Sequence, residues 1–268
     1  MSKTILVTGA GSGFGEAVAI GMARNGHRVI ATAQISPQVY ALRRKGEELG
    51  LRDRLIVEKL DLLDPHDMRH AQRWDIDVLW NNAGIGESGP VSEIPMDLVR
   101  RNYEVNVFKP LELTQAFARR WVDEGRKAKV VFTSSMGGLF TPAGWGVYVS
   151  TKHALESIAE ALQQELAPFG IKVQTINPGA YLTGYNETMA DTAFRWLDDA
   201  RHFTRSDQLR ATFDALLGQP EGHLDPQEMI DRMIDIVPAE EGKFRNVCPR
   251  FVEDMLKRSQ LDAWERSI

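Results

Sequence analysis

Segments typical of buried β-strands alternate with helical segments from the start of the chain to about residue 178. The strand-like segments span residues 4–10, 28–34, 54–62, 77–84, 129–135 and 172–179. Several are nearly continuous in Val, Ile and Leu, as expected when helices cover both faces of a parallel sheet. Such an alternation forms a doubly wound sheet through right-handed crossovers. The sequence therefore predicts one α/β domain.

A glycine-rich segment, TGAGSGFG at residues 8–15, joins the first expected strand to an expected helix at 15–25. Gly9 permits a tight turn, Gly13 lets a pyrophosphate approach the backbone, and Gly15 allows close packing of helix and strand. The N–H groups and dipole of the helix then face the phosphates. Many glycine-rich strings are only turns, but one between a strand and an amphipathic helix predicts dinucleotide binding.

Tyr148 and Lys152 stand four residues apart at the start of a long helical segment, residues 147–166. On a helix this spacing places both side chains on one face. We expect the ammonium to favour the phenolate and lower the pKa of Tyr148, which would make a proton donor and acceptor. Alone, such a pair is more often ordinary surface chemistry. This pair follows the glycine-rich turn by the length of chain that forms a nucleotide-binding sheet, and this combination favours a catalytic role.

These motifs and their spacing resemble the short-chain dehydrogenase/reductase family. The marks are TGxxxGxG at 8–15, NNAG at 81–84, Asn106 in an NV pair, Ser135 thirteen residues before Tyr148, the YxxxK at 148–152, and a PGxxxT at 178–183. The resemblance covers residues 4 to about 183. It implies a single-domain Rossmann-like doubly wound parallel sheet of about seven strands in the order 3-2-1-4-5-6-7.

The resemblance also implies roles for individual residues. Tyr148 would exchange a proton with a carbonyl or alcohol oxygen, and Ser135 would hydrogen-bond that oxygen. Lys152 would also hold the nicotinamide ribose, and Asn106 would kink its helix and hold a water linking Lys152 to solvent. The nicotinamide would carry the hydride. The cofactor-binding residues would be Gly9, Ser12, Gly13, Phe14, Gly15, Gln34, Asp61, Leu62, Asn82, Ala83, Gly84, Tyr148, Lys152, Pro178, Gly179, Tyr181 and Thr183.

The second expected strand ends in Ala33-Gln34. Family members that prefer NAD usually have an acid near this position, and those that prefer NADP often have an arginine one position later. Absence of an acid removes the repulsion of a 2′-phosphate. Arg43 and Arg44, however, are expected to lie too far along the next helix to bind that phosphate. The sequence favours NADP slightly and leaves NAD open.

After Gly179 the strand pattern stops. We expect a domain over residues 1–268, with a cofactor and catalytic core at 1–179, a helical substrate lid at 180–237 over the carboxyl edge of the sheet, and a last strand and C-terminal helix within 238–268. The last strand, at 243–249, resembles that of hydroxysteroid- and retinol-type relatives. The expected substrate residues are Glu87, Leu139, Trp145, Tyr181, Tyr185 and Trp196.

Those residues predict a small to medium, hydrophobic or aromatic ketone or secondary alcohol as substrate. The alternative for each aromatic is simple packing, which is favoured by roughly two to one for any single residue. Trp80 and Lys109 depart from the small residues that are common at their positions. A catalytically silent cofactor-binding regulator, and a lyase or dehalogenase, are the other functions considered. Relatives of these kinds usually lose the catalytic residues or the loop glycines that this chain keeps.

The composition sets the remaining expectations. A net charge of −5 gives no nucleic-acid or anionic-membrane surface, and no apolar run approaches membrane-spanning length. The single cysteine, Cys248, fits a reducing cytosol and is interpreted as an inert thiol. His66 and His70 have a metal-compatible spacing but no third ligand, so no metal is expected. We expect a cytoplasmic homodimer or homotetramer that acts on a small molecule.

Overall fold

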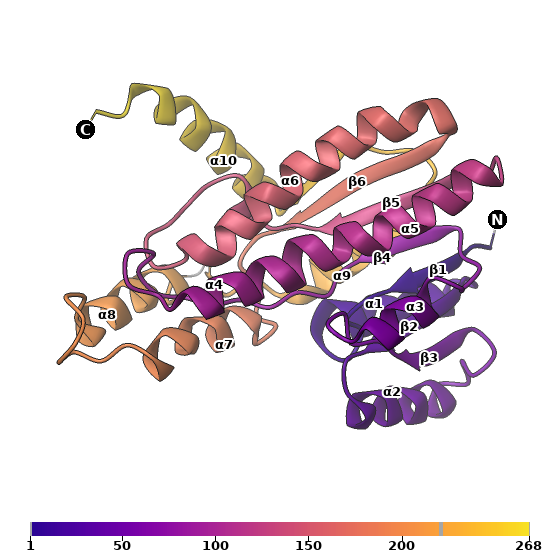
Figure 1. The fold of residues 1–268 in the computed structure, drawn as a ribbon, viewed down its shortest axis with the longest axis horizontal. Coiled ribbons are helices and arrows are strands. Elements are labelled where there is room, and N and C mark those ends of the chain that lie inside the picture. The colour runs from indigo at the N-terminus through magenta and orange to yellow at the C-terminus, as the bar shows by residue number, and fades with distance from the viewer. Residues whose placement is uncertain (1, 220–221, 268) are drawn as a thin grey trace.

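Seven strands form one parallel sheet, in the order β3-β2-β1-β4-β5-β6-β7 that the sequence predicts. The computed structural model describes residues 2–219 and 222–267, and Figure 1 shows its fold. The strands are β1 (Thr4–Val7), β2 (Arg28–Ala33), β3 (Leu55–Lys59), β4 (Val78–Asn81), β5 (Ala128–Thr133), β6 (Ile171–Pro178) and β7 (Arg245–Cys248). Each lies inside its predicted segment or within one residue of it, and the predicted seventh strand is confirmed.

Helices cover both faces of this sheet, as the apolar strands require. They are α1 (Gly13–Arg24), α2 (Ser36–Glu48), α3 (Pro65–Ala71), α4 (Met96–Tyr103), α5 (Lys109–Asp123), α6 (Gly146–Leu166), α7 (Tyr185–Thr192), α8 (Ser206–Leu217), α9 (Pro226–Ile236) and α10 (Arg250–Asp262). The first helix ends where the sequence indicates. Gly26 adopts a φ of 92°, and the His27 N–H donates to the Met22 carbonyl at 3.1 Å, closing the helix end.

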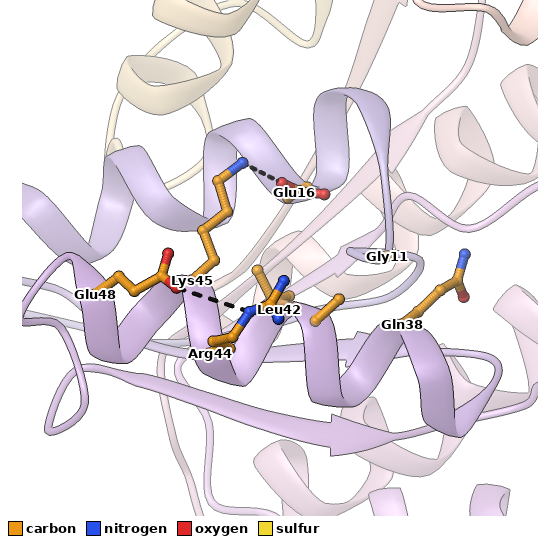
Figure 2. Close-up of a pocket in the computed structure, with 8 residues that line it drawn as sticks. Gly11, Glu16, Gln38, Leu42, Arg44, Lys45 and Glu48 are labelled. Atoms are coloured by element: carbon orange, nitrogen blue, oxygen red, sulfur yellow. Dashed lines mark hydrogen bonds and ion pairs between the residues drawn. The ribbon is translucent and has the colours of Figure 1, made fainter.

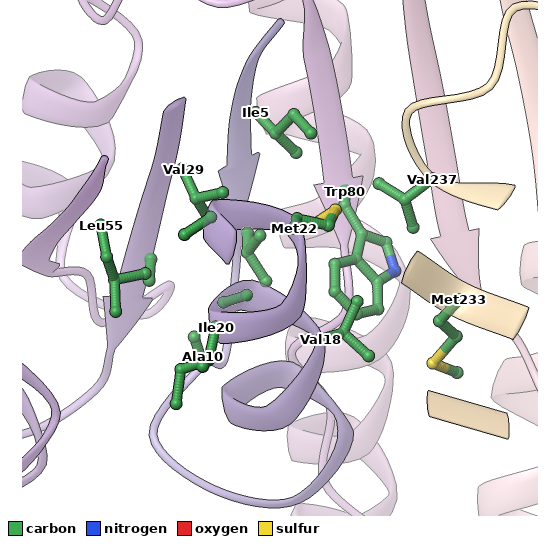
Figure 3. Close-up of a cluster of buried hydrophobic side chains, with 14 of the residues drawn as sticks. Ile5, Ala10, Val18, Ile20, Met22, Val29, Leu55, Trp80, Met233 and Val237 are labelled. Carbon is green, nitrogen blue, oxygen red and sulfur yellow. The ribbon is translucent and has the colours of Figure 1, made fainter. Parts of the chain in front are cut away.

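Successive strand residues point to opposite faces and so enter two separate cores. On one face Trp80 of β4 packs among residues from α1 and α9, including Met22 and Met233 (Figure 3). On the other, Leu79 packs with Phe117 and Trp121 of α5. Trp80 is fully buried, so the unusual tryptophan in this strand fills the core between the sheet and these helices.

The segment 180–237 is helical as predicted, but only part of it lies over the carboxyl edge. Helices α7 and α8 lie beyond the end of the sheet, away from the N-terminus (Figure 1). Helix α9 instead packs against α1, where a Cβ at Gly21 would lie 2.2 Å from the Ile234 side chain. Helix α9 therefore lies on a face of the sheet and not over its carboxyl edge, where the whole segment was expected. The apolar stripe through Met229 and Met233 is fully buried against the sheet, which holds α9 on its face.

Two further observations concern the described part of the chain. None of its helices combines the length and apolar character needed to cross a bilayer. It also contains no group of three or more His, Cys, Asp or Glu side chains arranged to hold a metal ion. His66 and His70 lie on α3, where the ring of His70 packs edge-on against Trp74 at 5.5 Å.

Candidate active site

One cavity of about 720 Å³ opens at the carboxyl ends of the strands. All the residues that the sequence assigns to cofactor binding line it, from Gly9 in the first loop to Thr183 after β6. The catalytic candidates Ser135, Tyr148 and Lys152 line the same cavity. Segments far apart in the sequence therefore meet at one place, as expected for ligand sites in open α/β sheets.

The glycines of the first loop are required by its geometry. Gly9 has a φ of 70°, and a Cβ there would lie 2.7 Å from the Ala83 Cα. A Cβ on Gly15 would lie 2.3 Å from the Gly9 carbonyl oxygen. Gly13, with a φ of 55°, has only the Thr183 side chain within 4.0 Å of an added Cβ and faces the cavity. The loop thus packs tightly against the protein at Gly9 and Gly15 and is open toward the cavity at Gly13.

The start of α1 supplies donors to this open side. Ser12 precedes the helix and makes no side-chain cap hydrogen bond, and Ser12 to Gly15 all line the cavity. The first N–H groups of a helix have no partner within the helix, and the positive end of its dipole lies there. A diphosphate fits this loop because its charge and oxygen atoms match the donors that the backbone presents.

A smaller pocket of about 270 Å³ adjoins the loop at Gly11 and Gln38 (Figure 2). Its two cations face carboxylates: Lys45 pairs with Glu16, and Arg44 lies 3.7 Å from Glu48. Arg43 also has partners, because its guanidinium donates to the Val57 carbonyl at 2.7 Å. All three cations thus already have partners within the chain.

Gln34 lies at the other end of the cavity, beside Asp61. Its Nε2 donates to the Asp61 Oδ2 at 3.3 Å, and both side chains line the cavity. Ala33 is fully buried in the core. An acid introduced at Ala33 would therefore enter the core, whereas the side chain at Gln34 lines the cavity.

Hydrogen bonds connect Trp80 to the glycine-rich loop. The Trp80 indole N–H donates to Thr133 Oγ1 at 2.8 Å, and this hydroxyl donates to Asn82 Oδ1 at 3.2 Å. The Asn82 amide then donates to the Thr8 and Gly9 carbonyls, both at 3.1 Å. The tryptophan that departs from the motif thus helps to hold the NNAG segment against the loop.

Asn106 lies in a π-helical turn, Glu104–Phe108, between α4 and α5. The predicted irregularity in its helix is therefore confirmed, and such turns often occur at functional sites. Asn106 Oδ1 accepts from the Ile85 N–H, and its amide donates to the Ile85 carbonyl, both at 2.8 Å. Asn106 does not itself line the cavity but fixes the segment that does. Lys109, just after the turn, pairs with Glu112 at 2.8 Å and Glu104 at 3.5 Å.

Tyr148 is buried at the inner end of the cavity. Burial raises its pKa to about 12, while hydrogen bonds from the Ser135 and Tyr185 side chains act in the opposite direction. The structure thus differs from the expectation of a lowered pKa. The reason is that burial removes the solvation of the phenolate, and this loss outweighs the two hydrogen bonds. The Lys152 Nζ lies 5.6 Å from the centre of the Tyr148 ring.

Lys152 is buried on the same helix face as Tyr148, as the spacing predicts. Its Nζ donates to the Thr133 carbonyl at 2.8 Å. Burial lowers its pKa to about 8, and the nearby charge of Glu156 opposes this shift. The ammonium is therefore present below about pH 8 and is lost as the pH rises through that value.

A polar network behind these residues was not found from the sequence. The buried Glu156 accepts from Asn177 Nδ2 at 2.6 Å and from Arg245 Nε at 2.9 Å. Asn177 also donates to the Ser135 carbonyl at 3.2 Å. The network thus supports both the serine and the lysine. The sequence feature that could have revealed this network is the acid four residues after Lys152, because that spacing places Glu156 one helical turn further along α6.

Three of the expected substrate residues line the cavity: Glu87, Tyr181 and Tyr185. The ring centres of Tyr185 and Tyr148 are 5.9 Å apart. Leu139, Trp145 and Trp196 are not among the lining residues. Trp145 is buried against Phe213 of α8, with ring centres 4.9 Å apart. Trp196 packs on Gly89, where an added Cβ would lie 2.3 Å from its ring. These tryptophans serve packing.

Tyr181 and Cys248 form a separate buried contact. The Tyr181 hydroxyl donates to the Cys248 sulfur at 3.2 Å, so that hydroxyl points away from the cavity. The Tyr181 ring meets Phe14 edge-on at 5.7 Å. Tyr181 therefore forms part of the cavity wall through its ring. His153, next to Lys152, lies 2.9 Å from the Val149 carbonyl through Nδ1 and takes no part in the cavity.

The geometry is that of a nucleotide-binding oxidoreductase fold with a serine, a tyrosine and a lysine at its ligand cavity. Residues 3–193 match the short chain dehydrogenase family model. An uncharacterised oxidoreductase of Bacillus subtilis is 30% identical over 90% of this chain and 86% of its own length. The 1-deoxy-11-beta-hydroxypentalenate dehydrogenase of Streptomyces exfoliatus is 34% identical over 66% of this chain and 67% of its own.

A solved structure agrees with these sequence matches. The short-chain dehydrogenase from Streptomyces avermitilis is 30% identical, has a TM-score of 0.78, and covers 99% of this chain and 96% of its own. The protein belongs to the short-chain dehydrogenase/reductase family.

Proposed function

We propose that this protein interconverts an alcohol, most often a secondary one, and the corresponding ketone or aldehyde with NAD or NADP as cofactor. The observation that carries the proposal is the meeting of Ser135, Tyr148 and Lys152 with the glycine-rich loop in one cavity. Gly13 leaves room for a diphosphate, and the start of α1 supplies backbone donors to it. A nicotinamide bound there supplies or accepts the hydride.

The side chains of the protein handle the proton and the oxygen. Tyr148, whose pKa is about 12, is protonated at neutral pH and donates its proton to the carbonyl oxygen during reduction. Ser135 hydrogen-bonds the same oxygen and stabilises the charge that develops on it. The Lys152 ammonium, 5.6 Å from the tyrosine ring, favours the phenolate that remains.

The relatives support this reaction class, and the apolar residues of the cavity wall support a largely apolar substrate. The Streptomyces exfoliatus relative is named for a hydroxylated carbon skeleton, 1-deoxy-11-beta-hydroxypentalenate, which it dehydrogenates. The cavity offers Ile85, Val105 and Met189 as apolar wall residues beside the two tyrosines. A catalytically silent regulator is disfavoured because the three catalytic side chains and the loop glycines are all present.

The proposal is tested by incubating the purified protein with a panel of alicyclic and aryl ketones and each reduced nicotinamide cofactor. Loss of cofactor absorbance with formation of the alcohol is the expected result. Cofactor binding, seen as a change in protein fluorescence, without turnover of any ketone or alcohol would favour the silent regulator instead.

The cofactor preference depends on the side chain at Gln34. Replacing Gln34 by Arg should raise the ratio of kcat/KM for NADPH to that for NADH by about fivefold, since one partly exposed charge pair contributes about 1 kcal/mol. Gln34→Asp should lower the same ratio. Gln34→Glu serves as a second acid with a longer reach. An unchanged ratio in all three variants would show that the ribose does not lie at Gln34.

A further inference from the structure

Two arginines, Arg101 and Arg195, line the same cavity as the catalytic residues. Arg101 belongs to α4, and Arg195 ends the 3₁₀ turn Ala193–Arg195 that follows α7. Both are exposed and both line the cavity. Among the residues that the structure describes, neither guanidinium has an ion-pair or hydrogen-bond partner.

The position of each arginine is fixed by its neighbours. Arg101 precedes Val105 by one helical turn, and Val105 lines the cavity beside the segment that Asn106 holds. Arg195 precedes Trp196, which packs on Gly89. The backbone before it is also held, because Thr192 Oγ1 accepts from the Ser88 N–H at 2.8 Å. The backbone next to each arginine is therefore held in place at the cavity.

The other charges that line the cavity are few. Among the described residues, its lining carboxylates are Glu87 and Asp61, and Asp61 accepts a hydrogen bond from Gln34 Nε2 at 3.3 Å. Burial is the main cause that raises the pKa of Tyr185, and the charge of Glu87 adds to this shift. Arg101 and Arg195 thus line the cavity without carboxylate partners, in a chain with a net charge of −5.

We propose that the substrate carries an anionic group, a carboxylate or similar, which Arg101 and Arg195 bind while its carbonyl or alcohol oxygen meets Tyr148. This inference rests on the proposed function and adds the substrate class to it. Guanidinium groups suit this task because they are always charged and match the two oxygens of a carboxylate. The apolar wall between the two ends would hold the carbon skeleton.

The test compares ketones that differ only in charge: 4-acetylbenzoate with methyl 4-acetylbenzoate, and 4-oxocyclohexanecarboxylate with its methyl ester. Binding to the protein loaded with cofactor is measured by calorimetry, and turnover is measured separately. The acids should bind about tenfold more tightly than the esters, since a hydrogen bond to a charged group contributes on this order. Arg101→Gln and Arg195→Gln should each remove most of that difference and leave ester binding unchanged.

Arg100→Gln is the matched control, because Arg100 is the neighbouring residue on α4 and does not line the cavity. It should leave the preference for the acids intact. Equal binding of acids and esters by the wild type, or an equal loss in the Arg100 variant, would overturn the inference. A preference in binding without turnover of either compound would support the anion site and count against the proposed reaction.

Discussion

Tyr148→Phe should reduce the rate of ketone reduction by about 10³-fold, the range lost when a positioned general acid is removed. The hydroxyl group is the only part of the side chain that is lost, and the ring remains to fill the buried space beside Tyr185. Cofactor affinity should stay within about twofold of the wild type, because the diphosphate contacts come from the loop at residues 8–15. Rapid-mixing measurements of the reduction step, with a fluorescence titration of cofactor, check both expectations.

Tyr103→Phe provides the control for this variant. The Tyr103 hydroxyl lies 3.1 Å from the Oγ of Ser150, which belongs to the same helix as Tyr148. Tyr103 itself does not line the cavity. Its loss should leave the rate nearly unchanged. A Tyr148→Phe enzyme that keeps the wild-type rate would contradict the assignment of Tyr148, and an equal loss in both variants would indicate a structural effect on α6.

Lys152→Ala should lower kcat by about a hundredfold and weaken cofactor binding as well. The ammonium favours the phenolate that forms when Tyr148 gives up its proton, and Lys152 lies in the cavity near Gly84, where an added Cβ would be 3.8 Å from its Nζ. The variant therefore loses charge at both the tyrosine and the cofactor site. Lys152→Met, which keeps most of the volume, separates the loss of charge from the loss of packing.

The pH dependence of the same pair gives an independent measurement. Burial lowers the pKa of Lys152 to about 8, so the ammonium is lost as the pH rises through that value. The wild-type rate of ketone reduction should therefore fall above about pH 8, well before Tyr148 ionises near its pKa of about 12. Lys152→Met should show a lower rate without this fall. The same fall in the variant would assign the ionisation to another group.

The sequence predicted the sheet and the cofactor loop because both depend on local, periodic signals. Strands buried on two faces are continuous in apolar residues, and the loop glycines occupy positions where a side chain would either clash, as at Gly9 and Gly15, or strain the backbone, as at Gly13. The strand order, the position of Tyr148 beside Lys152, and the irregular turn at Asn106 all appear in the structure as expected. The pairing of Tyr148 with Lys152 follows from spacing along the chain, whereas the strand order and the turn at Asn106 were implied by the family resemblance.

The substrate end could not be predicted in the same way. Trp145 and Trp196 looked like pocket residues, but aromatic side chains fill cores equally well, and only the packing of α8 and Gly89 decides their place. Arg101 and Arg195 carry no motif, and their meeting at one cavity depends on how two distant segments fold together. The pKa of Tyr148 depends on burial, which spacing does not reveal.

The most direct measurement follows a deuterium atom from the nicotinamide to the product. The protein is incubated with 4-acetylbenzoate or an alicyclic ketone and with NADH or NADPH deuterated on either face of C4, and the alcohol is examined by mass spectrometry. Deuterium should appear on the carbinol carbon from one face of the cofactor only. Alcohol free of deuterium from both faces, or no alcohol from any ketone while the folded protein binds cofactor, would contradict the assignment of this cavity to hydride transfer.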